Sequence, residues 1–101
     1  MPLYFTQLIY IKNGAEETFH QFEDVAIPLI AKYNGQLLLR LRPTLETIVE
    51  ANMPQPYEVH LVEFESKQDF QNFMGDEERK QFLHLKEASI ESVWLIEGQK
   101  L

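Results

Sequence analysis

The period of the hydrophobic residues along this chain changes from two to about 3.6 and back, and this order restricts the fold more than any other feature. Residues 3–11 (LYFTQLIYI) are rich in aromatic and β-branched side chains, which predicts a strand. Over residues 15–33 apolar side chains recur at spacings of three and four, which predicts an amphipathic helix. Asn34-Gly35 is typical of a left-handed helix end. Pro28 should kink or split that helix.

The second half of the chain repeats this change of period. Residues 36–42 (QLLLRLR) and 57–64 (YEVHLVEF) alternate as strands do, and residues 45–49 are a candidate extension of the first of these. A helical region with a break at its centre is predicted over residues 66–87. The last strand is predicted at residues 90–96.

The predicted order β-α-β-β-α-β over residues 1–101 is that of one α+β domain, a ferredoxin-like sandwich with an antiparallel four-stranded sheet. Two helices cover only one face of such a sheet, so the other face of a monomer should be polar. The first strand instead places Phe5 and Ile9 on one face and Tyr4 and Leu8 on the other. Both faces therefore require burial, which predicts a homodimer packed sheet to sheet.

Several short motifs extend this interpretation. They are Tyr4 at the opening of the first strand, Tyr33-Asn34-Gly35 before a strand that carries Arg40, and residues 62–66 (VEFES) before a helix with aromatic residues. In these features the chain resembles the dimeric α+β barrel superfamily, and within it the uncharacterised branch called domain of unknown function 1330. The resemblance implies a homodimer whose two sheets face each other around a cavity. Other branches include cofactor-independent monooxygenases, small cyclases and muconolactone isomerases, but the similar branch implies no particular reaction.

Composition excludes several classes of function. Sixteen acidic and nine basic residues give a net charge of −7, which argues against nucleic acid and anionic membrane surfaces as partners. The absence of cysteine excludes disulfides, thiolate nucleophiles and cysteine-ligated metals. The longest apolar run, residues 25–31, is far shorter than the ~20 residues that span a bilayer. No basic residue precedes Lys12, which is not typical of a signal peptide, so a cytoplasmic location is expected.

No sequence motif indicates a cofactor or a metal, and none is expected. The four glycines form no phosphate-binding loop or nucleophile elbow. His20, His60 and His84 lack the spacing of metal ligands. His60 shares its parity with the helix-facing residues of its strand and is interpreted as a histidine at the edge of the core that is bonded to the backbone, in preference to a catalytic one. His20 and His84 are expected on solvated helix flanks.

Strand parity predicts a polar site on the sheet face that lies away from the helices. If Leu37, Leu39 and Leu41 face the helices, then Arg40 faces the interior of the barrel together with Glu63. A lone buried charge is costly, so these two are expected to pair. The candidate ligand-binding residues are Tyr4, Thr6, Tyr10, Arg40, Arg42, Glu63 and Trp94. The candidate catalytic residues among them are Glu63, Arg40 and Tyr10.

Two functions follow from this site. The first is a homodimer that binds a small organic molecule in the barrel cavity and acts as a cofactor-independent oxygenase, isomerase or cyclase by general acid–base chemistry. The alternative is a non-catalytic binding or accessory dimer whose polar interior is structural. A cavity reached by both Glu63 and Arg40 would favour the first, and a filled interior the second. Trp94 and the tyrosines are expected in the dimer core, with Trp94 largely buried.

Overall fold

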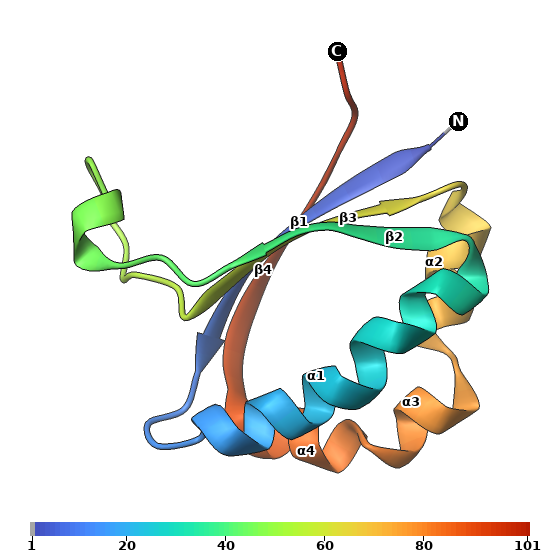
Figure 1. Cartoon of the computed structure of the whole chain (residues 1–101), viewed down its shortest axis with the longest axis horizontal. Coiled ribbons are helices and arrows are strands. Elements are labelled where there is room, and N and C mark those ends of the chain that lie inside the picture. Colours follow the sequence, from blue (N-terminus) through green and yellow to red (C-terminus); the bar gives the residue numbers. More distant parts are fainter. Residues whose placement is uncertain (1) are drawn as a thin grey trace.

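The computed structural model describes residues 2–101 and shows a four-stranded antiparallel sheet with all α-helices on one face (Figure 1). The elements are β1 (Leu3–Ile11), α1 (Glu16–Ile30), η1 (Ala31–Tyr33), β2 (Gly35–Leu41), η2 (Leu45–Thr47), β3 (Glu58–Phe64), α2 (Lys67–Met74), α3 (Glu77–Gln81), α4 (Leu83–Ser89) and β4 (Ile90–Gly98). The strand order in the sheet is β2-β3-β1-β4. The predicted β-α-β-β-α-β order and the ferredoxin-like α+β fold are confirmed.

The helix after β1 ends as the sequence predicts, although Pro28 does not split it. Pro28 lies in the last turn of the continuous helix α1, which passes into the 3-10 turn η1. Asn34 then adopts the left-handed conformation, with φ of 59°. The next residue must be small, because a Cβ on Gly35 would lie 2.7 Å from side-chain atoms of Ile30 and Phe64. This turn brings β2 back over the C-terminal end of α1.

The helical region after β3 is divided by two side-chain caps. Ser66 accepts a hydrogen bond from the backbone of Asp69 over 3.1 Å and begins α2, as predicted. Asp76 accepts one from the backbone of Arg79 over 2.9 Å and begins α3. The Tyr33 hydroxyl also donates to Asp76, which ties the break between α2 and α3 to the end of α1. This hydrogen bond fixes the position of α3, the helix that carries Arg79.

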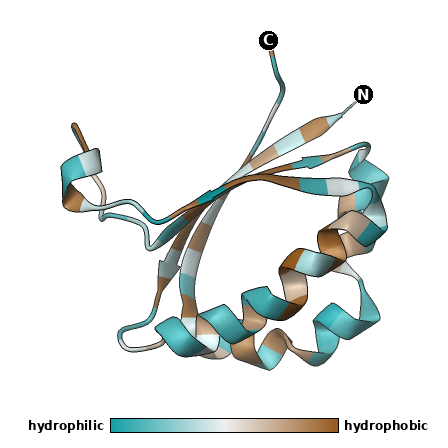
Figure 2. Cartoon of the chain, in the orientation of Figure 1, coloured by the Kyte–Doolittle hydropathy of each residue, from teal (hydrophilic) through white to brown (hydrophobic). Residues whose placement is uncertain are grey.

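Both faces of the sheet are apolar, as predicted. The core between sheet and helices is a cluster of six buried residues: Phe5, Leu29, Ile30, Val62, Phe64 and Phe73. Hydrophobic stretches run along the strands and the C-terminal half of α1 (Figure 2). On the outer face Leu39, Leu41, Trp94 and Ile96 are exposed. Trp94 is 57% exposed on this single chain, so its burial stays a prediction about the dimer.

Strand β2 contains a bulge that changes the predicted faces. Its register against β3 shifts between Leu37 and Leu39, and an extra residue of this kind reverses the face of every later side chain. Leu39 and Leu41 therefore lie on the outer face, and Arg40 lies opposite His60 on the helix-facing side. The prediction that the three leucines share the helix-facing side is wrong beyond Leu37.

The connection between β2 and β3 projects beyond the sheet (Figure 1). The predicted extension over residues 45–49 is wrong, since the short 3-10 helix η2 lies there instead. Tyr10 holds this connection to the sheet, because its hydroxyl donates to the carbonyl of Pro54 over 2.6 Å. None of the helices within residues 2–101 has the length and apolar content needed to cross a membrane.

Candidate functional site

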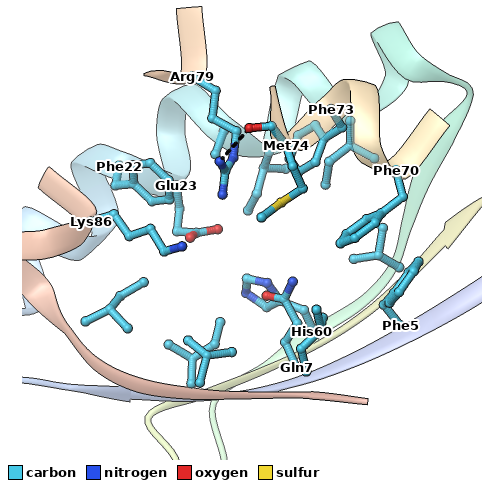
Figure 3. A pocket seen from close by; sticks show the side chains of 18 of the residues that line it. Phe5, Gln7, Phe22, Glu23, His60, Phe70, Phe73, Met74, Arg79 and Lys86 are labelled. Carbon is cyan, nitrogen blue, oxygen red and sulfur yellow. Dashed lines mark hydrogen bonds between the residues drawn. The ribbon is translucent and has the colours of Figure 1, made fainter. Parts of the chain in front are cut away.

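A cavity of about 180 Å³ lies between the sheet and the helices. Gln7 and His60 line its sheet side, while Glu23, Arg79 and Lys86 reach it from the helices (Figure 3). Most of the remaining wall is apolar and includes several of the core aromatic residues: Phe5, Phe22, Phe64, Phe70 and Phe73. Three other lining residues are partly exposed: Met74, Val93 and Leu95. The cavity therefore opens to solvent between α2 and β4.

Within residues 2–101, Arg79 is a buried cation that forms no ion pair with a carboxylate. It is 6% exposed, and its guanidinium carbon lies 5.3 Å from the ring centre of Phe73 and 5.7 Å from that of Phe22. One guanidinium nitrogen, Nη1, donates to the carbonyl of Met74 over 3.3 Å. Among residues 2–101 its buried Nε has no hydrogen-bond partner. The side chain therefore brings to the cavity a positive charge and an unused donor.

Glu23 and Lys86 add two further ionisable groups to the same wall (Figure 3). Glu23 is 7% exposed, and burial raises the pKa of its carboxyl to about 6. Burial lowers the pKa of the Lys86 amine. In the described part of the chain, Glu23, Arg79 and Lys86 form no ion pair with one another. The helix side of the cavity thus has two cationic side chains and one carboxyl, and none of the three forms an ion pair within residues 2–101.

A carboxylate network supports the sheet side of the cavity. Glu58 is fully buried and accepts hydrogen bonds from Arg40 Nε over 2.7 Å, Arg40 Nη2 over 3.2 Å and Arg42 Nε over 2.9 Å. Its Oε1 also lies 2.5 Å from Nε2 of His60. Burial alone would raise the pKa of Glu58, but the hydrogen bonds from His60, Arg40 and Arg42 bring it down to about 2. Glu58 is therefore ionised at neutral pH.

The predicted pair of Arg40 and Glu63 is wrong. The bulge places Arg40 on the helix-facing side, where Glu58 is its partner, while Glu63 lies on the outer face. There Glu63 lines an open hollow of about 550 Å³ together with Tyr4 and Thr6, as the parity of β1 and β3 predicts. Three of the predicted site residues, Tyr4, Thr6 and Glu63, therefore lie together. Arg40 and Arg42 lie apart from them, beside Glu58.

The remaining predicted residues lie apart from one another. Tyr10 lies in a second outer hollow beside the β2–β3 connection, Arg42 contacts Glu58, and Trp94 is exposed on β4. His20 is half-buried rather than fully solvated, and its Nε2 lies 2.7 Å from the hydroxyl of Tyr57. The backbone partner predicted for His60 is wrong, because its Nε2 contacts the carboxylate of Glu58. No group of three or more His, Asp or Glu side chains within residues 2–101 is arranged to hold a metal ion.

Sequence reasoning missed most of the cavity residues. A signal was present for Glu23, which follows Phe19 by four residues and so lies on the buried stripe of α1. A signal was also present for Glu58, which shares its parity with His60. Nothing local marks Arg79, because its burial depends on the cap at the break between α2 and α3.

Comparison with known proteins supports the fold. No protein-family model and no curated protein matches the chain. Among solved structures, the protein RPA0582 of unknown function from Rhodopseudomonas palustris is 16% identical, with a TM-score of 0.83 over 99% of this chain and 82% of that one. A NIPSNAP family protein of unknown function from Agrobacterium tumefaciens is 21% identical, with a TM-score of 0.70 over 96% and 86%. A dabb family protein with a ferredoxin-like fold from Mesorhizobium loti is 12% identical, with a TM-score of 0.70 over 99% and 97%. At these identities the similarity shows the fold alone.

Proposed function

We propose that this protein binds a small organic anion with an apolar body in the cavity between its sheet and its helices. The observation that carries the proposal is the buried guanidinium of Arg79, whose Nε has no partner among residues 2–101. Burying a charge without a counter-ion is costly, and an unsatisfied donor adds to that cost. An anionic ligand would remove both costs at once.

The rest of the cavity suits the same class of ligand. Lys86 supplies a second positive charge near the first, and the aromatic wall formed by Phe5 and Phe70 suits an apolar body (Figure 3). With a pKa of about 6, Glu23 is largely ionised at neutral pH and becomes neutral in mild acid. An ionised Glu23 competes with the ligand for the two cations, so the anion should bind more tightly as the pH falls through 6.

The test compares two probes of the same shape, phenylacetate and its neutral analogue phenylacetamide, by nuclear magnetic resonance titration. Phenylacetate should bind the wild-type protein at least about tenfold more tightly than the amide, because only the carboxylate forms an ion pair with Arg79. Arg79→Met should remove this preference. Lys80→Met, which removes an exposed cation from the same helix, should leave it unchanged.

Equal affinities for the acid and the amide would refute the proposal, as would an Arg79→Met variant that still prefers the acid. The alternative function, in which the polar interior is only structural, remains open for the network formed by Glu58, Arg40 and Arg42. Glu58 is fully buried and has partners on both oxygens, so Glu58 and its arginines fit a structural role. The sequence led us to expect ligand binding if one cavity were reached by both Glu63 and Arg40, and these residues lie on opposite faces of the sheet. The proposal of ligand binding rests on Arg79 instead.

We further propose that two copies pack through their outer sheet faces, as in the superfamily and the uncharacterised branch that the sequence resembles. The exposed apolar residues of β2 and β4 support this, and the hollow lined by Tyr4, Thr6 and Glu63 would lie between the two sheets. Sedimentation should find a dimer at micromolar concentration, and Trp94 fluorescence should be that of a buried indole. A stable monomer of 11.9 kDa with a water-exposed indole would contradict this assembly.

A further inference from the structure

We propose that His60 is the base of a proton-transfer reaction in this cavity and that the substrate is a small 2-oxo acid with an apolar side chain. This inference rests on the proposed function, since it needs an anion held at Arg79. It assigns His60 a chemical role and gives Glu58 a positioning role in addition to its structural one.

The network at Glu58 fixes which ring nitrogen of His60 bears the proton. An ionised carboxylate can only accept hydrogen bonds, and Oε1 of Glu58 lies 2.5 Å from Nε2 of His60. Nε2 must therefore be the donor, so the neutral ring has its lone pair on Nδ1. Among residues 2–101, the hydrogen bond of the His60 ring is made by Nε2 with Glu58, and none is formed by Nδ1. A carboxylate that orients a histidine and leaves its second nitrogen free is the arrangement of a general base.

The cavity places this base opposite the groups that would hold the substrate. His60 and Gln7 reach the cavity from the sheet, while Arg79 and Lys86 reach it from the helices (Figure 3). A carboxylate bound at the helix side, with the neighbouring 2-oxo oxygen turned to the same two cations, would direct carbon 3 of the substrate toward His60. The apolar wall would hold the side chain of the substrate and keep water from the reacting carbon.

The proposed step is balanced without a co-reactant. The bond between carbon 3 of the 2-oxo acid and one of its hydrogens breaks, and the proton moves to Nδ1 of His60. The electron pair forms the double bond between carbons 2 and 3 of an enolate. The negative charge on the enolate oxygen is stabilised by the two cations. Return of the proton from Nδ1 to the oxygen gives the enol tautomer, and its return to carbon regenerates the keto acid. Nothing is oxidised or reduced in either case.

The experiment uses phenylpyruvate as the probe and measures exchange of its methylene protons for deuterium in heavy water by proton magnetic resonance. Wild-type protein should accelerate this exchange, and His60→Gln should lower the acceleration by about 100-fold, the usual contribution of a general base. His60→Gln should still bind the probe, whereas Arg79→Met should lose both binding and exchange. His84→Gln, at an exposed position, is the matched control and should behave as wild type.

The two proposals can fail separately. Binding that depends on Arg79, without accelerated exchange, would overturn the role of His60 and leave the proposed function intact. Failure of phenylpyruvate to bind a wild-type protein that still binds phenylacetate through Arg79 would also overturn the inference alone, whereas failure of both anions to bind would overturn both proposals. A second measurement requires no variant: nitrogen-15 resonance of the wild-type protein should show His60 with its proton on Nε2. A neutral ring protonated on Nδ1 would refute the inference even if His60→Gln fails to fold.

Discussion

Replacing Glu58 by glutamine should destabilise the protein by about 3 kcal/mol at neutral pH. Glu58 is fully buried, and its partners are two arginines and a histidine. Breaking a buried pair costs about 3–5 kcal/mol, and the lower end applies here because the side chains of Arg40 and Arg42 are 32% and 51% exposed. The pKa of Glu58, lowered from 4.5 to about 2, gives the same magnitude, since each unit corresponds to about 1.4 kcal/mol.

The same network predicts how this cost depends on pH. The folded pKa of Glu58 lies below the unfolded one, so its stabilisation is fully present above 4.5 and is lost as the pH falls toward 2. Urea denaturation from neutral to acidic pH should therefore show a difference between wild type and Glu58→Gln that shrinks over that range. Glu65→Gln, at an exposed position just after the same strand, is the control and should cost less than about 0.5 kcal/mol. Equal stabilities of the two variants at neutral pH, or a difference that acid does not reduce, would refute the reasoning.

Three further predictions concern stability and can be measured by the same denaturation experiments. Glu23→Gln should stabilise the protein by about 2 kcal/mol at neutral pH, because the folded pKa of about 6 lies above the unfolded 4.5. This gain should disappear below pH 4.5, and a gain that persists there would contradict burial as its cause. Gly35→Ala should cost about 1–3 kcal/mol because the added Cβ meets buried side chains at 2.7 Å, whereas Gly98→Ala meets nothing within 4 Å and should be tolerated. Ser66→Ala should cost about 1 kcal/mol through loss of the cap on α2, and an unchanged stability would show that this cap is dispensable.

The fold could be predicted from the sequence because each element has its own local signal. The alternation in β1 and β3, the apolar stripe of α1 and the turn at Asn34 all act over a few residues, and the structure retains them. Pro28 is the exception, since it lies in the last turn of α1 and the chain passes from there into η1 without a break.

The candidate site was less predictable, because its composition depends on register and on tertiary burial. The alternation in β2 could not show the extra residue, so Arg40 was assigned to the wrong face and to the wrong carboxylate. Arg79 follows a break in a helical region, a position that usually carries exposed charge, and only the packing of Phe22 and Phe73 around it makes it a cavity residue.

The bulge in β2 leaves Leu38 without a cross-strand partner, since Leu37 pairs with Val62 and Leu39 pairs with Leu61. A chain that lacked this one residue would alternate regularly and would still place Arg40 opposite His60 and beside Glu58. The loss of one codon at this point would therefore leave the counter-charge of the buried carboxylate in place. Among relatives of this fold, strands with and without the bulge should both keep a basic residue at this position wherever the carboxylate at the start of β3 is present.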